Sequence, residues 1–283
     1  VISGSGAVKE NILKGEDIDL YRLPVPKWNP GDGGRYIFTM VSMVTRHPLT
    51  GQLNLGTYRG MVVEKNKVAV LLARTTDWGK HYTLKEKNKE ALPVAAVLGW
   101  DPTLFFCSGT PMDAEEYSVC GAIRGEPVPL VKCETSDLMV PASAEIVIEG
   151  HISPDPSTFR MEGPFAEYPG YYAGMAEPRN VVTVDCISHR NNPILVGLVA
   201  GATPGRYPSD GFWLKYFWPA AVWNSIENAG ILGVTDVHFD GWPEILKVQI
   251  RKSYRAQAQH IASAIWGSKF AHSGAKIVIV VDE

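Results

Sequence analysis

The 283-residue sequence predicts a mixed α+β and α/β protein, in which a barrel-like β domain is followed by a smaller α/β domain. Two observations lead to this prediction. Up to about residue 200, short runs rich in β-branched residues follow one another closely, and such closely spaced strands favour a sheet that closes into a barrel. Beyond residue 201, helical and strand patterns alternate, which is typical of an α/β domain. We therefore expect a lead-in segment over 1–34, the β domain over 35–200 and the α/β domain over 201–283, with the boundary near 195–205.

The β domain is predicted from short apolar runs that Gly, Pro or Asn residues bound on one or both sides. The expected strands lie at 36–45, 59–63, 67–73, 92–99, 144–152, 180–188 and 193–200. A lysine-rich helix at about 82–91 interrupts the series. The polar, turn-rich stretch before residue 35 carries no strand pattern.

The second domain begins with a helix over 212–230, with Pro219 near its start and Gly230 at its end. A strand over 244–250 follows, and the apolar residues of 254–270 then recur at helical spacing. The chain closes with "KIVIVVDE", which has the pattern of a buried strand. Because this run ends the sequence and no Met begins it, we expect a fragment or processed product of a longer protein, with an incomplete second domain.

Composition excludes some classes of function. The net charge is −3, from 27 basic and 30 acidic residues, so no basic surplus indicates a nucleic-acid partner. No apolar run approaches the roughly 18–20 residues of a membrane span. The four cysteines form no C-x-x-C pair, which favours small buried thiols in a reducing compartment. We expect a cytoplasmic protein.

The stretch "EGPFAEYPGYY" (162–172) carries two carboxylates, Glu162 and Glu167, five residues apart. This spacing suits neither one helix face nor one strand face. The Gly-Pro and Pro-Gly pairs within it indicate turns. The pattern predicts a shaped loop that presents two acids among aromatic residues.

Other polar residues could complete a site. Arg59 in "GQLNLGTYRG" could hold one acid of a carboxylate pair ionised, although a surface arginine after a turn is the simpler interpretation. Asn54, His81 and Glu116 together offer oxygen and nitrogen ligands suited to Mg²⁺ or Mn²⁺. Separately, His81 reads as a helix cap or surface residue, and Glu116 as an acid in a first helical turn. Spacing alone does not show that the three converge.

Several blocks of sequence resemble the UbiD family of decarboxylases. They are "DGGRYIFTMVSMVTRHPLTGQLNLGTYRGMVV", "LPVAAVLGWDP", "EEYSVCGAIRGEPVPLVKCETSDLMVPASAEIVIEG" and "EGPFAEYPGYY", in matching order and spacing across most of 10–260. The resemblance implies that the β domain is a flavin-binding split barrel. It also implies a carboxy-lyase that uses prenylated FMN to remove or add CO₂ on aromatic or α,β-unsaturated acids.

The resemblance also implies roles for individual residues. Arg59, Glu162 and Glu167 match the catalytic set, in which the arginine pairs with the first acid and the second acid donates a proton. Asn54, His81 and Glu116 match ligands that bridge Mn²⁺ or Mg²⁺ to the flavin phosphate, with K⁺ often nearby; Glu115 is a rival for Glu116. The positions that match cofactor contacts are Thr39, Asn54, Gly56, Thr57, Arg59, His81, Cys107, Ser108 and Lys252.

The substrate region and the partners follow by the same analogy. Arg206 and Tyr207, in "ATPGRYPSD", match residues that line the substrate pocket, although a turn-rich surface connection reads equally well. The family implies a small carboxylic acid substrate, a flavin prenyltransferase as cofactor supplier, and a homodimer or higher homo-oligomer. The alternatives are a flavin-binding split barrel or oxidoreductase without decarboxylase activity, and a glycosidase-like hydrolase that uses the two acids.

Overall fold

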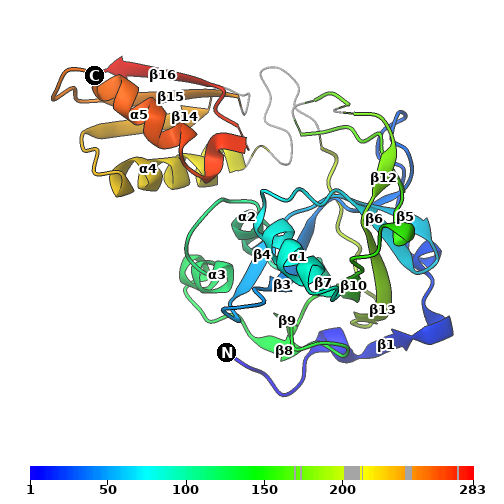
Figure 1. The fold of residues 1–283 in the computed structure, drawn as a ribbon. Coiled ribbons are helices and arrows are strands. Elements are labelled where there is room, and N and C mark those ends of the chain that lie inside the picture. The colour runs from blue at the N-terminus through cyan, green and yellow to red at the C-terminus, as the bar shows by residue number, and fades with distance from the viewer. Residues whose placement is uncertain (169, 173, 201–210, 212, 240–243, 273) are drawn as a thin grey trace. The chain divides into compact units, whose positions relative to one another are not determined.

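The computed structural model describes residues 1–283 except 169, 173, 201–210, 212, 240–243 and 273. The chain divides into two compact units, which are described separately (Figure 1). The first comprises Val1–Ser108, Ala114–Ala166 and Tyr172–Val199, and the second comprises Gly109–Asp113, Glu167–Tyr171 and Ala200–Glu283. The domain bounds expected from the sequence stay a prediction.

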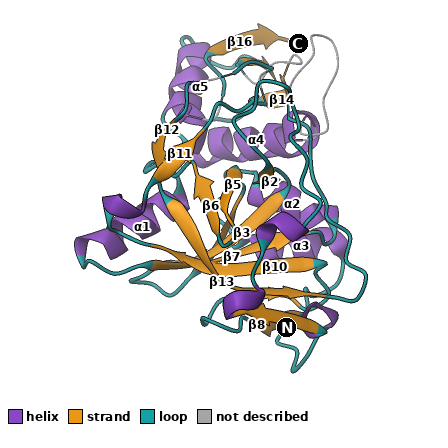
Figure 2. Cartoon of the chain, turned by 90° about the vertical axis from the view of Figure 1, so that its right-hand side faces the viewer, coloured by secondary structure: helices purple, strands orange, loops and turns teal. Residues whose placement is uncertain are grey.

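The first unit is built on a large antiparallel sheet, in which nine strands pair within the described residues. Its strands are β1 (Asn11–Lys14), β2 (Tyr36–Phe38), β3 (Val41–Arg46), β4 (Leu53–Gly56), β5 (Gly60–Glu64), β6 (Lys67–Val70), β7 (Leu92–Leu98), β10 (Ile146–Ile152) and β13 (Val181–His189). The strand order is β2-β5-β6-β13-β10-β7-β3-β4, and β1 pairs with β13. Figure 2 shows β7, β10 and β13 side by side. Because no pairing joins β2 to β4 among these strands, the sheet is split rather than closed.

Three helices and two small hairpins complete this unit. The helices are α1 (Asp77–Lys87), α2 (Pro102–Ser108) and α3 (Glu116–Arg124), and the hairpins pair β8 (Leu130–Lys132) with β9 (Met139–Pro141) and β11 (Arg160–Glu162) with β12 (Glu177–Arg179). Helix α1 packs on β3, β4 and β7, and α2 packs on β3 and β4. The core beneath α1 includes Trp78 and Tyr82, both fully buried. Burial of these large rings, and not the helix propensity of the lysines, fixes where α1 lies.

The second unit is a small α/β layer. Strands β14 (Val234–Phe239), β15 (Ile245–Ile250) and β16 (Ile277–Asp282) form its sheet, in which β16 runs parallel to β15. A π-helical turn over Trp213–Phe217 leads into α4 (Trp218–Asn228), and α5 (Gln257–Trp266) follows β15. Pro219 lies in the first turn of α4, where a missing N–H costs nothing. Alternate residues of β15 are buried against a core that includes Trp218, Ile261 and Phe270.

The fold class predicted from the sequence, a β domain followed by a small α/β domain, is confirmed. All four cysteines are free and buried, also as predicted. In the described part of the chain, no helix is both long enough and apolar enough to cross a bilayer.

Several local predictions are wrong. The run at 193–200 forms no strand, because Leu198 donates its N–H to the Thr39 hydroxyl and Gly197 lies against the ring of Trp28. The lysine-rich helix starts at Asp77, not near residue 82, so His81 lies inside it. The closing strand β16 is not buried on both faces: Ile277 is 53% exposed, while Val278 packs against the core. Strands β1 and β4 and helix α2 were not predicted.

Candidate active site

A buried ion pair joins Arg59 and Glu162. Arg59 immediately precedes β5, and Glu162 is the last residue of β11, which packs on β5. Arg59 Nε donates to Oε1 of Glu162 at 2.9 Å, and Arg59 Nη2 donates to Oε2 at 3.0 Å. The Glu162 side chain is 1% exposed. Two parallel hydrogen bonds make this a bidentate pair, the strongest common geometry between arginine and a carboxylate.

Tyr36 supplies a third donor to the same carboxylate. Its hydroxyl donates to Glu162 Oε1 at 2.6 Å, and its side chain is fully buried in β2. Burial, followed by the hydrogen bond to Glu162, raises the pKa of Tyr36 well above its ordinary value. The phenol therefore stays protonated and remains a donor at neutral pH.

An aromatic ring covers the pair. The Phe165 ring lies 4.4 Å from the Tyr36 ring, and the Arg59 guanidinium carbon lies 5.3 Å from the Phe165 ring centre. The latter distance lies within the range of a cation–π contact. This apolar cover keeps water away from Glu162, so each hydrogen bond to it is stronger than it would be in solvent.

The loop that carries Glu162 is held from a second side by Asp32, which is buried. Asp32 Oδ1 accepts from Ala166 N at 3.0 Å, and its Oδ2 accepts from Asn29 N at 2.8 Å. Gly163 adopts a φ of +100°, which favours glycine. The predicted shaped loop is therefore present, and the buried Asp32 carboxylate bonds to its backbone four residues after its first acid.

Glu167 belongs to the second unit. It is half-buried and begins a tight turn, in which its N–H donates to Tyr171 O and its own carbonyl accepts from Gly170 N, both at 2.9 Å. Tyr168 packs edge-on toward Trp218, with ring centres 6.4 Å apart. The turn predicted around the second acid is thus formed by backbone hydrogen bonds.

The expected metal ligands gather around strands β3 and β4. Asn54 lies opposite Thr45 in the β3–β4 register, and the Thr45 hydroxyl lies 3.0 Å from His81 Nδ1. The neighbouring Leu55 donates its N–H to Glu116 Oε2 at 3.2 Å. The two strands thus bring Asn54, His81 and Glu116 into one region, although the residues come from β4, α1 and α3.

The chemistry of this set fits a hard divalent cation. Burial, followed by the nearby His47, lowers the pKa of His81 to about 4, so its imidazole is neutral and able to act as a ligand. Glu116 is buried, and Asn54 would offer its amide oxygen, because an amide NH₂ group is a donor and does not bind cations. Across the part of the chain that the structure describes, no three His, Cys, Asp or Glu side chains group as a metal site, so a metal here would need the asparagine as a ligand.

The remaining predicted cofactor contacts are spread over both units. In the first unit, Thr39 accepts from Leu198 N, Thr57 donates to Val41 O, and Ser108 bonds to the hydroxyl of Ser42. Cys107 is buried, and its pKa is raised by a hydrogen bond with Cys120 and by burial, so it is a thiol and not a nucleophile.

Gly56 and Lys252 lie in different units, and two further predicted positions fall outside the described residues. Gly56 has no room for a side chain, since an added Cβ would lie 2.2 Å from the Tyr58 hydroxyl. Lys252, in the second unit, is exposed, and its N–H donates to Asp282. Arg206 and Tyr207 lie outside the described residues.

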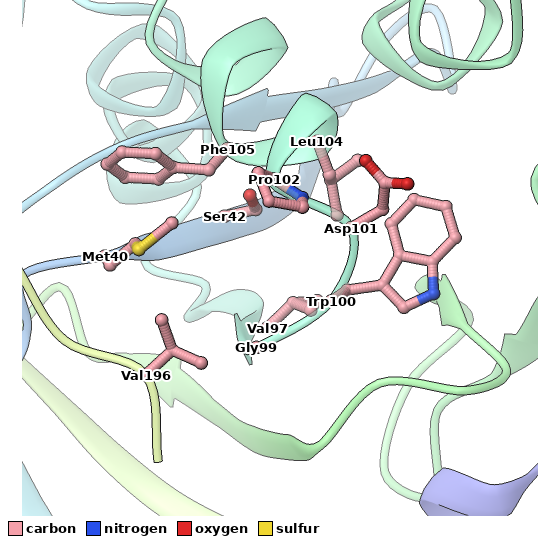
Figure 3. A pocket seen from close by; sticks show the side chains of 10 residues that line it. All are labelled: Met40, Ser42, Val97, Gly99, Trp100, Asp101, Pro102, Leu104, Phe105 and Val196. Atoms are coloured by element: carbon pink, nitrogen blue, oxygen red, sulfur yellow. The ribbon is translucent and has the colours of Figure 1, made fainter. Parts of the chain in front are cut away.

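A small hollow lies in the first unit, between β3, β7 and α2 (Figure 3). It measures about 20 Å³. The side chains that point toward it include Met40, Ser42, Phe105 and Val196. A space of this size holds about one water molecule, so it is not a substrate pocket.

Comparison with known proteins identifies the family. The family model described as the 3-octaprenyl-4-hydroxybenzoate carboxy-lyase Rift-related domain, UbiD, matches residues 1–203, and the model of the C-terminal domain of the same carboxy-lyase matches residues 217–283. The chain belongs to the UbiD family. The resemblance of the sequence to this family is thereby confirmed.

Related proteins are named as decarboxylases. The chain is 32% identical over 286 residues to a phenolic acid decarboxylase of Sedimentibacter hydroxybenzoicus, covering 97% of the chain and 58% of that protein. It superposes on the vanillic acid decarboxylase structure of the same organism with a TM-score of 0.90 at 30% identity, covering all of the chain and 60% of that one.

A second solved structure is bound to a cofactor. The UbiD-class enzyme HmfF of Pelotomaculum thermopropionicum, in complex with prenylated FMN, gives a TM-score of 0.85 at 30% identity and is covered to 64%. The UbiD-family chain thus spans little more than half the length of the relatives that it matches.

Sequence analysis missed Tyr36 and Asp32. Asp32 lies in the turn-rich stretch that was expected only as a lead-in segment, and Tyr36 is the first residue of the strand predicted over 36–45. An acid between glycines, just before a buried strand, was the available signal. Their partners lie 126 and 134 residues further along the chain, which no local pattern shows.

Proposed function

We propose that this chain is the catalytic part of a UbiD-type decarboxylase, which releases CO₂ reversibly from a small aromatic or α,β-unsaturated carboxylic acid with prenylated FMN. The observation that carries the proposal is the buried bidentate pair of Arg59 and Glu162, covered by Phe165 and completed by the Tyr36 hydroxyl. A protein that only binds flavin has no need of a desolvated carboxylate held by three donors. The named activities of the relatives support the same class of reaction.

The catalytic residues and the cofactor have different roles in the proposed reaction. When bound, prenylated FMN supplies an electron sink for the electron pair that is left as CO₂ departs. Arg59 and Glu162 place two opposite charges at fixed positions beside the reacting atoms. The polar groups around the substrate then need to reorient less during the reaction. Glu167 is the general acid that returns a proton to the carbon that has lost CO₂.

A divalent cation, Mn²⁺ or Mg²⁺, would be held by Asn54, His81 and Glu116. Such a cation would bind the flavin phosphate through oxygen ligands, with Lys252 as a further positive charge for the phosphate and K⁺ as a second ion. Thr39, Gly56, Thr57, Cys107 and Ser108 are proposed as further cofactor contacts, and Arg206 and Tyr207 as substrate contacts. We further propose a cytoplasmic homodimer or larger homo-oligomer that receives its cofactor from a flavin prenyltransferase.

The proposal is tested by screening substrates. The chain, produced together with a flavin prenyltransferase, is incubated with a panel of hydroxylated benzoic acids, furoic acids and phenylacrylic acids, and the release of CO₂ is measured. We expect turnover of at least one member, and loss of that turnover in Glu162→Gln with flavin still bound. Failure of every acid with protein that demonstrably carries prenylated FMN would overturn the proposed activity.

A further inference from the structure

A segment outside the expected site, residues 29–36, contacts the acid loop, residues 162–166, through Asp32, Gly33 and Tyr36. Asp32 Oδ1 accepts from Ala166 N at 3.0 Å, and Gly33 N donates to Pro164 O at 2.7 Å. The Tyr36 hydroxyl donates to Glu162 Oε1 at 2.6 Å and lies at a longer 3.3 Å from Pro164 O. Together these contacts fix residues 162–166 from one side. We propose that residues 29–36 are a positioning element for the acid loop and that Tyr36 is the positioning residue for Glu162, an inference that rests on the proposed function for its catalytic consequence.

The Tyr36 hydroxyl restrains the Glu162 carboxylate in a direction that Arg59 does not. Arg59 engages both oxygens of Glu162, but it approaches from one edge of the carboxylate only. Oε1 accepts from Arg59 Nε at 2.9 Å and also from Tyr36, so the carboxylate is held from two directions. Because Glu162 is 1% exposed, no solvent molecule can readily replace the lost donor.

Tyr36 is itself held in place by the sheet. Strand β2 pairs with β5, with Tyr36 opposite Met61 and Phe38 opposite Gly60, the residue that follows Arg59. The Trp28 indole donates to the Tyr36 carbonyl at 2.8 Å, and the phenol ring packs against Phe165. The donor thus lies in β2 and the arginine directly before the paired strand β5, so the pairing of these strands fixes the distance between them.

The rest of the segment is shaped to approach the loop closely. A Cβ on Gly33 would lie 2.0 Å from the Gly163 carbonyl oxygen, so only glycine permits this approach. Asp32 is 2% exposed, and both of its oxygens accept backbone N–H groups. Its carboxylate therefore acts on the backbone of the loop, while Tyr36 acts on the Glu162 side chain.

The test is a double-mutant cycle between Tyr36→Phe and Glu162→Gln, read in two ways. Thermal and chemical unfolding of the flavin-free chain measures whether the two changes are coupled in stability. Turnover and KM of the loaded protein, with flavin content measured in parallel, report on catalysis. Tyr82→Phe is the matched control, because it removes the hydroxyl of another fully buried tyrosine, which donates to Ser153 O at 3.3 Å.

We expect Tyr36→Phe to lower kcat about 10-fold or more, the loss expected for a hydrogen bond to a charged group, with KM and flavin content within about twofold of the parent. In the unfolding cycle, Tyr36→Phe should cost less stability in the Glu162→Gln background than in the parent, and Tyr82→Phe should leave kcat unchanged. A parental kcat in Tyr36→Phe, or unfolding effects of the two changes that simply add, would overturn the inference.

The two proposals fail in different ways. If the parent releases no CO₂ from any acid, the proposed function fails, while the unfolding cycle still decides whether Tyr36 and Glu162 are coupled. If the parent turns over but Tyr36→Phe does so equally well, the positioning role fails and the proposed function stands.

Discussion

Leu55 donates its backbone N–H to the carboxylate of Glu116 at 3.2 Å, which ties the start of α3 to strand β4 directly beside Asn54. Glu116, a proposed metal ligand, is thus held by the backbone of the strand that carries Asn54, a second proposed ligand. The contact also separates Glu116 from its neighbour Glu115, whose carboxylate is exposed and accepts from the Ser118 hydroxyl. The two adjacent acids therefore have different surroundings.

This difference gives the first prediction. Glu116→Gln keeps the shape of the side chain but removes its charge, so we expect loss of most bound Mn²⁺ or Mg²⁺ and weaker retention of flavin. Metal content by mass spectrometry and flavin content by absorbance measure the effect. Glu115→Gln is the matched control and should keep both. A protein that retains full metal as Glu116→Gln, and loses it as Glu115→Gln, would reverse the ligand assignment.

The second prediction concerns the pH dependence of stability. The pKa of His81 is about 4 in the fold, below the ordinary value of 6.5, because of burial. Between these values the unfolded chain binds more protons than the folded one, so metal-free protein loses stability as the pH falls from about 6.5 to about 4. His81 alone would contribute up to about 3 kcal/mol to this loss.

Chemical denaturation in the presence of a chelator measures the contribution of His81. We compare the parent with His81→Gln at pH 7, 5.5 and 4.5, and expect the parent to lose more stability than the variant over this range. If the difference between the two proteins does not change with pH, the buried neutral imidazole does not exist in solution.

The third prediction concerns Glu167. Glu167→Gln keeps the size of the side chain and removes the proton, so we expect normal binding of prenylated FMN and metal but a loss of about 10²–10⁴-fold in turnover. Deuterium from D₂O should no longer enter the product. Glu167→Asp should keep partial activity, because an acid remains. Near-parental turnover of Glu167→Gln, with deuterium still incorporated, would assign the proton transfer to another group.

Much of the fold follows from local sequence pattern. The runs that form β5, β6, β7, β10 and β13 are rich in β-branched residues and bounded by turn residues. The local pattern therefore predicts a strand where the structure has one. The run at 193–200 has the same character but no strand partner, because Gly197 and Leu198 are engaged by Trp28 and Thr39. In the opposite case, "LNLG" became strand β4 although its residues read as a turn.

The site was predictable only in part, for a physical reason. The turn pattern of their loop singled out the two acids, the resemblance to a family gave them and Arg59 their roles, and the structure joins Arg59 to Glu162. The contacts of Tyr36 and Asp32 with the acid loop depend on how distant strands pair, and sequence spacing carries no record of that. The start of α1 was also predicted wrongly, because the helix was located by its lysine-rich stretch. Burial of Trp78 and Tyr82 in the core determines where the helix lies.

The central claim, decarboxylation that depends on prenylated FMN, is tested most directly by comparing two preparations of the same chain. One is produced with a flavin prenyltransferase and the other without it, and CO₂ release from the best acid of the panel is measured per mole of protein. We predict turnover only in the first preparation, in proportion to its content of prenylated flavin. Equal turnover in the two preparations would contradict the account.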